Sequence, residues 1–335
     1  MKKLTIFLMT IILALTSVVF VGCNKDDNKI VVNEVTHSIF YAPLYVAINN
    51  GYFKEEGLEI ELVNGGGSDA TMTALLSGSA QIGLMGPETN VFVASQGRQD
   101  YPVIFGQLTK RDGSFLVGRN PEPDFDWSNL EGKYFIAGRR GGSPAMSLQY
   151  ALEKNGYDIN NDLTFDLSVA FNNTVGAFEG GLGDYVTMFE PTASEYVAAG
   201  KGYIVASVGE ESGEVPFTCF SANRSYLDKN PEKIEKFLKC IIRAYNFITT
   251  EDIEKVIDAL VPSFDGTSRN SIRYAIESYV RIDAWMDTPV MLQTSFNRLQ
   301  DVIVGAGELE STNRVDFSKV VDNSYAENVL QKYFK

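Results

Sequence analysis

Residues 65–88, GGGSDATMTALLSGSAQIGLMGPE, join a glycine run to a short helix, an apolar strand and a Gly-Pro-Glu turn. The glycine run is not a phosphate-binding loop, because no Gly-Lys-Ser/Thr follows it, and it does not match Gly-x-Gly-x-x-Gly. The backbone N–H groups of residues 67–69 could instead donate to a ligand oxygen at the start of the helix. The alternative is a plain tight turn. Asp69 in the first helical turn already occupies part of the positive field there, which weakens the case for an anion.

A second glycine turn, Gly141-Gly142-Ser143, precedes a helix that has Pro144 at its start, and it lies beside Arg139 and Arg140. A helix N-terminus and a guanidinium both favour negative charge. This turn could therefore hold a carboxylate, sulfonate or phosphate group. The alternative is that the two arginines point to solvent.

Two acidic residues follow apolar segments: Glu88 after Pro87, and Glu190 before Pro191. A carboxylate repels a small oxyanion unless it is protonated, so two acids near a ligand favour one with N–H donors or a positive charge. Each glutamate could instead cap the helix that it begins.

The chain has one histidine, His37, which could hydrogen-bond a ligand or be a solvated loop residue. Phe40 and Tyr41 could stack on a flat ring. Ordinary packing under the following helix is the alternative, and we expect it for one of the two. Phe171 and Trp285 have the same two interpretations.

Catalytic signatures are not found in the sequence. The single histidine has no Gly-x-Ser-x-Gly elbow, and no Cys/His cluster has the spacing of metal ligands. We expect a protein that is not an enzyme and that uses neither a cofactor nor a metal.

The formal net charge of the 335 residues is −14, which makes nucleic acid and anionic lipid poor partners. The length suggests two lobes, and we expect a monomer. Cys219 and Cys240 are expected to be buried apolar side chains. A disulfide between them stays open at the level of sequence.

The N-terminus has the pattern of an export signal. Lys2 and Lys3 precede an apolar run at residues 4–21, and Gly22-Cys23 ends it before a polar stretch. We expect residues 1–22 to be a lipoprotein signal peptide and residues 23–30 a tether. Cys23 would carry the lipid that anchors the exported protein to the outer face of the cell membrane. A single transmembrane anchor is the alternative.

Strands alternate with helices along the rest of the chain. The predicted strands are 29–35, 58–63, 82–85, 103–108, 134–137, 163–167, 185–189 and 203–207, and helices lie between them at 43–50, 70–77, 88–96, 145–155, 175–179 and 192–199. Helices at 231–250, 253–260, 268–286 and 290–306 follow. This alternation predicts an α/β fold with mainly parallel sheets.

The two strand–helix series predict two lobes. The expected crossings between them are residues 114–118 and 217–221. The first lobe would comprise residues 31–115 and 218–335, and the second residues 116–217. Ligands of open α/β sheets bind beyond the carboxyl ends of the strands, where this chain has aromatic, glycine and hydrogen-bonding residues. The candidate ligand contacts are His37, Phe40, Tyr41, Gly66, Gly67, Ser68, Gly86, Glu88, Arg139, Gly142, Ser143, Asn172, Asn173 and Glu190.

The segments HSIFYAPLYVAINNGYFKEEGLEIEL, GGGSDATMTALLSGSAQIGLMGPE, GDYVTMFEPTASEY and NPEKIEKFLKCIIRAYNF resemble the binding proteins of ABC importers. The branch is the superfamily that takes aliphatic sulfonates, nitrate, taurine or thiamine-pyrimidine precursors. The resemblance covers essentially the whole chain after the signal. It implies a type II periplasmic-binding-protein fold, with two parallel or mixed sheets flanked by helices and a cleft between the lobes that closes by hinge motion. It also implies delivery of a small molecule to a membrane permease and its ATPase.

The resemblance also bears on the ligand. In members that bind the pyrimidine precursor, an acidic residue and aromatic residues face the ring, and Glu190 matches the family's Glu-Pro step. A flat nitrogen heterocycle such as a thiamine pyrimidine precursor is therefore expected. A sulfonate- or nitrate-type anion held by Arg139 and residues 141–143 is the alternative, and a ligand-sensing lipoprotein without transport is another. The yeast branch, which makes pyrimidine from its own histidine, needs a cysteine-rich stretch that is not seen in this sequence.

Overall fold

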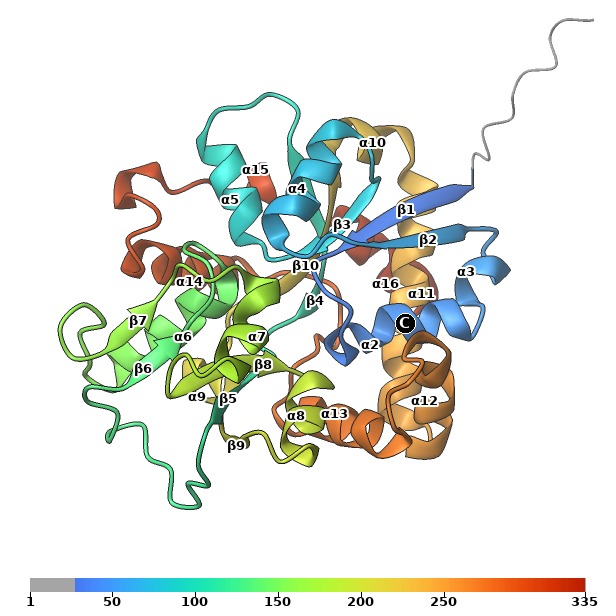
Figure 1. Cartoon of the computed structure of the whole chain (residues 1–335). Helices are drawn as coiled ribbons and strands as arrows, with labels where there is room; N and C mark the ends of the chain where they lie inside the picture. The colour runs from blue at the N-terminus through green and yellow to red at the C-terminus, as the bar shows by residue number, and fades with distance from the viewer. Residues whose placement is uncertain (1–27, 335) are drawn as a thin grey trace, which may run out of the picture.

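The computed structural model describes residues 28–334, in which the chain forms two five-stranded sheets (Figure 1). The predicted signal peptide and Cys23 lie outside the described residues. The first sheet has the order β2-β1-β3-β10-β4, and the second has the order β7-β6-β8-β5-β9. The first sheet contains β1 (Lys29–Glu34), β2 (Glu59–Asn64), β3 (Ile82–Met85), β4 (Pro102–Thr109) and β10 (Thr218–Asn223). The second contains β5 (Ser114–Gly118), β6 (Tyr134–Ile136), β7 (Thr164–Asp166), β8 (Tyr185–Phe189) and β9 (Tyr203–Ser207).

Each sheet is mixed rather than mainly parallel, because each accepts a strand that arrives from the other sheet. β10 pairs antiparallel with β3 and β4, and β5 pairs antiparallel with β8 and β9. The chain leaves one sheet at the carboxyl ends of its parallel strands, so it enters the facing sheet in the reverse direction. We call each sheet with its helices a lobe. β5 begins at Ser114 in the second sheet, so the end proposed for the first lobe, residue 115, falls inside a strand of the second. The start proposed for the first lobe, residue 31, falls inside β1, so residues 29 and 30 of the proposed tether belong to that strand. The other lobe boundaries stay a prediction.

Short helices follow the strands on both lobes. They are η1 (Ile39–Tyr41), α2 (Ala42–Asn49), α3 (Tyr52–Glu55), α4 (Ser68–Ser77), α5 (Glu88–Ser95), α6 (Ser143–Lys154), η2 (Phe171–Asn173), α7 (Thr174–Glu179), α8 (Thr192–Ala198) and α9 (Val208–Ser212). The predicted helices end within about two residues of these bounds, as is usual for helix termini. α3 and α9 were not predicted, because four or five residues are too few to show a helical period.

The C-terminal part is helical, as predicted for residues 231–306, and helices that were not predicted precede and follow that range. Its elements are α10 (Arg224–Lys229), α11 (Pro231–Thr250), α12 (Ile253–Leu260), η3 (Val261–Ser263), α13 (Arg269–Arg281), α14 (Gln293–Gly305), η4 (Ser311–Asn313), α15 (Phe317–Val320) and α16 (Ser324–Tyr333). The bounds of α11 and α12 match the prediction, whereas α13 stops five residues earlier than expected, before a turn at Asp283 with φ 53°.

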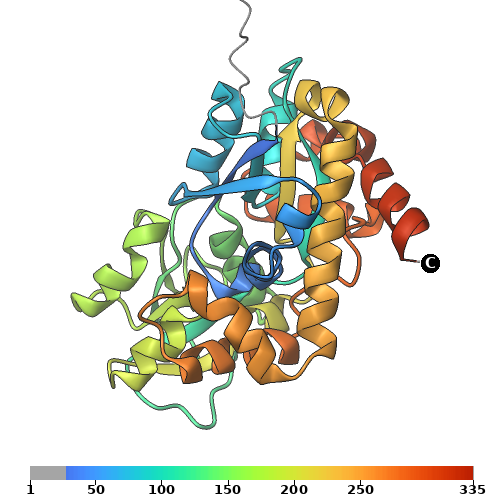
Figure 2. The same cartoon turned by 90° about the vertical axis from the view of Figure 1, so that its right-hand side faces the viewer.

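Helix α11 is the support of the first lobe, and Figure 2 shows it running along the side of the first sheet. Its apolar stripe, which includes Ile234, Phe237 and Leu238, is buried. The Phe237 ring lies 5.0 Å from that of Phe220 in β10 and 5.1 Å from that of Phe53 in α3. This packing holds β10, and therefore the second crossing, against the first lobe.

Between residues 28 and 334, no helix combines the length and apolar character that a membrane span requires. Cys219 in β10 and Cys240 in α11 are buried and free. The disulfide that the sequence left open is therefore not formed.

Candidate functional site

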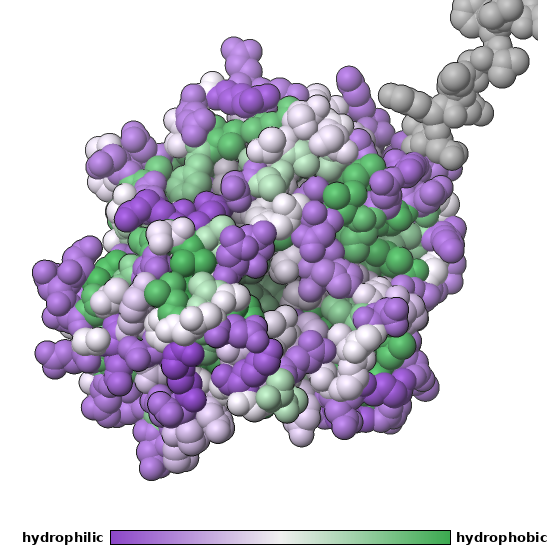
Figure 3. Space-filling model, in the orientation of Figure 1, coloured by the Kyte–Doolittle hydropathy of each residue, from purple (hydrophilic) through white to green (hydrophobic). Residues whose placement is uncertain are grey.

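A pocket lies between the two lobes, and on the face shown in Figure 3 a recess marks where the lobes meet. About 540 Å³ of space inside it, including its open mouth, is not filled by atoms. The walls come from the ends of strands in both lobes. The lining residues are Val35, Thr36, Tyr41, Gly67, Ser68, Gly86, Ala137, Gly138, Arg139, Gly142, Ser143, Pro144, Ala145, Phe171, Phe189, Phe217 and Thr218.

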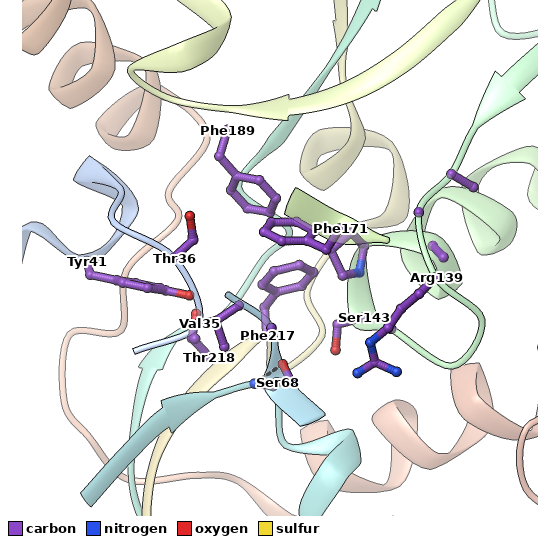
Figure 4. A pocket seen from close by; sticks show the side chains of 17 residues that line it. Val35, Thr36, Tyr41, Ser68, Arg139, Ser143, Phe171, Phe189, Phe217 and Thr218 are labelled. Atoms are coloured by element: carbon purple, nitrogen blue, oxygen red, sulfur yellow. Dashed lines mark hydrogen bonds between the residues drawn. The ribbon is translucent and has the colours of Figure 1, made fainter. Parts of the chain in front are cut away.

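Aromatic rings form much of the pocket wall. In Figure 4 the rings of Phe171, Phe189 and Phe217 lie together at the centre, with Tyr41 on one side and Arg139 on the other. The Phe189 ring is 5.9 Å from Phe171 and 6.1 Å from Phe217, measured between ring centroids. Such a wall offers flat apolar surface to a planar ligand.

Phe40 supports this wall from behind rather than lining it. Its ring is 1 % exposed and lies 5.6 Å from Phe189 and 5.8 Å from Phe217. Trp285 Nε1 donates a hydrogen bond to the Phe40 carbonyl at 2.9 Å. Of the pair Phe40 and Tyr41, Tyr41 reaches the pocket, as expected of one member.

The candidates from residues 66–68 divide between the wall and its rim. Gly67 and Ser68 line the pocket, and the Gly86 N–H donates to Ser68 Oγ at 3.4 Å. Gly66, with φ 76°, is not among the lining residues. A Cβ added at Gly66 would lie about 4.0 Å from the side-chain amide nitrogen of Asn172 in the other lobe. Gly66 and Asn172 therefore meet across the cleft. Asn172 and its neighbour Asn173 are exposed and do not line the pocket.

Glu88 joins the two lobes from just behind the wall. It is completely buried, and its Oε2 accepts a hydrogen bond of 2.6 Å from Ser143 Oγ, the first residue of α6. Burial raises the pKa of the Glu88 carboxyl, whereas the hydrogen bonds from Ser143 and the charge of Arg139 lower it. The result is a lobe-to-lobe contact with an acid at its centre.

Glu190 has a different position. Its carboxylate accepts from the Ser194 N–H at 2.9 Å and from Ser194 Oγ at 2.7 Å, so it caps α8 in its own lobe. Its backbone bridges the lobes: Ser38 Oγ donates to its carbonyl at 2.6 Å, and its N–H donates to the Tyr279 hydroxyl at 2.9 Å. Glu190 is not among the lining residues, and burial raises the pKa of its carboxyl.

Both candidate arginines are ion-paired. Arg139 lines the pocket, and its Nε lies 3.3 Å from Asp69 Oδ1 of the first lobe. Arg140 lies outside the pocket, where its Nη1 is 3.2 Å from Glu308 Oε1. Both pairs connect the lobes and leave less positive charge for an anion than the sequence suggested.

His37 lies away from the pocket and packs against the rings of Tyr45 and Phe264, which also contact each other. Its Nδ1 is 3.0 Å from Glu34 Oε1, and its Nε2 is 2.6 Å from the Ser263 carbonyl oxygen. Both partners are acceptors, and the hydrogen bond with Glu34 raises the pKa of the imidazole. These contacts favour a structural role for His37.

Two aromatic wall residues, Phe189 and Phe217, were not among the candidate ligand contacts. Phe189 is the last residue of β8, and Phe217 directly precedes β10. The rule that ligands bind beyond strand ends places Phe189 in a cleft loop, but it does not indicate which side chain of that loop faces the ligand. Phe217 lies in a crossing segment, where no periodic signal indicates which way a side chain points. Within the described part of the chain, no cluster of His, Cys, Asp and Glu could hold a metal ion.

Comparisons with known proteins identify the family of this chain. Residues 39–254 match the family model described as NMT1/THI5 like. YtlA of Bacillus subtilis (strain 168), which is named as a binding protein, is 41% identical over 313 residues, 93% of each chain. The 4-amino-5-hydroxymethyl-2-methylpyrimidine phosphate synthase of Aspergillus parasiticus is 26% identical over 226 residues, which cover 63% of this chain and 64% of that protein.

A solved structure shows the same fold. The alkanesulfonate-binding protein SsuA from Xanthomonas axonopodis pv. citri, bound to MOPS, matches with a TM-score of 0.71 at 17% identity, over 88% of this chain and 98% of that chain. The binding-protein fold expected from the sequence is thereby confirmed. Together with the family model and the likeness to YtlA, this shows that the chain belongs to the NMT1/THI5-like family.

Proposed function

We propose that the protein is the extracytoplasmic solute-binding component of an ABC importer and holds one small molecule between its lobes. The observation that carries the proposal is the pocket between the two sheets, which both lobes line with strand ends and helix starts. The family membership and the binding-protein name of YtlA support it. No step of the proposal requires chemistry on the solute, so the role is binding and not catalysis.

The proposed solute is a flat nitrogen heterocycle, such as a thiamine pyrimidine precursor. The aromatic wall of Tyr41, Phe171, Phe189 and Phe217 suits a planar ring. The hydroxyl groups of Thr36 and Ser68 on the wall can hydrogen-bond ring substituents. The Aspergillus parasiticus relative, named for a pyrimidine phosphate product, supports the same class of molecule.

A sulfonate-type anion is the second candidate. It is favoured by Arg139 on the wall and by the start of α6 at Ser143, and the structural neighbour SsuA is an alkanesulfonate-binding protein. The ion pair of Arg139 with Asp69 and the buried acid Glu88 count against it.

The proposed mechanism is closure of the lobes on the solute. The contacts Ser143–Glu88, Ser38–Glu190 and Arg139–Asp69 cross the cleft and are made only when the lobes meet. A solute that bridges the walls adds to these contacts and shifts the population toward the closed form. A permease would then recognise that form. The proposed lipid on Cys23 would keep the protein at the membrane, and a neighbouring receptor instead of a permease would make it a sensor.

Thermal unfolding tests the solute class. The purified protein, refolded to remove bound solute, is measured with pyrimidines, thiamine, flavins, taurine, alkanesulfonates and nitrate. A ligand at a hundred times its Kd adds ~2.7 kcal/mol to the free energy of unfolding, a shift of several degrees. A shift with pyrimidines alone supports the proposal. A shift with sulfonates alone selects the second candidate, and no shift with any compound contradicts both.

A further inference from the structure

One carboxylate lies at the starts of two helices that belong to different lobes. Glu88 is the first residue of α5, and its Oε2 accepts from the hydroxyl of Ser143, the first residue of α6. The N-cap residue of α6 is Gly142, which has no side chain to cap the helix. The positive end of a helix favours a negative group. Glu88 therefore supplies to α6, from the opposite lobe, the charge that a bound anion would otherwise supply.

The residues around the Glu88 carboxyl group leave room for it and bury it. A Cβ at Gly86 would overlap the Glu88 carboxyl group, so only glycine leaves room for it. Glu88 Oε1 is fully buried and has no hydrogen-bond partner. Gly86, Gly142 and Ser143 all line the pocket. The carboxyl group thus lies directly behind the pocket wall, at the point where the lobes close.

Nearby positive charge is already paired. Arg139 is the one charged residue among the described residues that line the pocket, and Asp69 compensates it. An anionic group that entered between Gly86 and Ser143 would approach the Glu88 carboxyl and compete with it for the start of α6. Like charges at such a distance repel strongly in a buried site.

We propose that Glu88 is a specificity-determining residue that occupies the place of an anionic solute group and restricts the pocket to neutral or cationic solutes. The inference rests on the proposed function and narrows it, because it names the charge class of the solute. It also explains how a fold shared with an alkanesulfonate-binding protein can serve a different class of molecule.

The test is whether removal of the carboxylate creates an anion site. Methanesulfonate and nitrate are titrated against the wild-type protein, Glu88→Ala and Glu88→Gln, with thermal unfolding and calorimetry as readouts. Glu88→Ala opens the space at the helix starts, and Glu88→Gln keeps the shape but removes the charge. The matched control is Glu190→Gln, which alters another buried glutamate near the cleft without changing the start of α6.

We expect Glu88→Ala to bind methanesulfonate at least roughly tenfold more tightly than the wild-type protein and Glu190→Gln do. The proposal is overturned if the wild-type protein binds either anion as tightly as Glu88→Ala, or if neither Glu88 variant gains binding. If Glu88→Ala does not fold, Glu88→Gln decides by the same criterion. This titration uses anions only and no heterocycle. A failure to find a heterocycle that binds and a failure of the Glu88 variants to gain anion binding are therefore separate results.

Discussion

Each lobe buries one glutamate near the start of a helix that follows a strand, and the two carboxylates have different hydrogen-bond partners. Glu190 turns its carboxylate onto Ser194 in its own lobe, and only its backbone reaches across. Glu88 turns its carboxylate onto Ser143 of the other lobe. The two glutamates stand at different places relative to their helices. Glu190 lies two residues before α8, where its carboxylate can fold back onto the first turn, whereas Glu88 is already the first residue of α5 and its carboxylate reaches Ser143 of the other lobe.

The largest expected difference between the two glutamates is in solute affinity. Glu88→Ala should weaken heterocycle binding roughly tenfold to hundredfold, because closure loses a hydrogen bond to a charged group worth about 1.5–3 kcal/mol. Glu190→Gln should stay within about threefold of the wild-type protein. Calorimetric titration of both variants measures this. Equal losses of affinity in the two variants would show that the two glutamate side chains contribute alike to closure on the solute.

The next largest effect is on stability, and here the substitution of Glu190 is the one that matters. Glu190→Ala should lower the free energy of unfolding by about 1 kcal/mol, because the side-chain cap of α8 is lost. The solute affinity should change little. Denaturant unfolding gives the stability, and Ser194→Ala should reproduce the loss because it removes the hydroxyl donor. A Glu190→Ala protein with unchanged stability would show that the cap contributes nothing.

The two acids should also differ in the pH dependence of binding. Burial raises the pKa of Glu88 in the closed form. If opening exposes this carboxyl, closure takes up a proton between the ordinary and the raised pKa, whereas above the raised pKa Glu88 stays ionised, as the exclusion of anions requires. Solute affinity should then fall as the pH rises from the ordinary glutamate value, about 4.5, through the raised pKa. This fall should vanish in Glu88→Gln and persist in Glu190→Gln, measured with one solute over one pH series. A fall that persists in Glu88→Gln would assign the proton to another group.

The smallest effect concerns the contact at the edge of the cleft. Arg140 pairs with Glu308 across the lobes, but 69% of its side chain is exposed. An exposed ion pair contributes about 0–1 kcal/mol and is screened by salt. Arg140→Ala should therefore change solute affinity by less than about fivefold, and raising the salt concentration should reduce the difference further. A loss as large as that of Glu88→Ala would mean that the edge contact, not the buried one, holds the lobes closed.

The sequence predicted the strands and helices of both lobes well because their apolar periods and glycine boundaries are local signals. It placed Glu88 and Glu190 at helix starts for the same reason. It left open which one caps its own helix, although Ser194 is only four residues from Glu190. The partner of Glu88 lies 55 residues away in the other lobe, and no local pattern indicates such a contact. The mixed sheets and the position of Phe217 likewise depend on how the crossings enter the fold.

The most direct test of the account is a calorimetric titration of the solute-free protein with 4-amino-5-hydroxymethyl-2-methylpyrimidine and, side by side, with methanesulfonate. We expect binding of one pyrimidine per chain, no heat from methanesulfonate, and at least roughly tenfold weaker pyrimidine binding in Phe217→Ala, which removes one ring of the wall. Binding of methanesulfonate without binding of the pyrimidine would contradict both the proposed solute and the role given to Glu88.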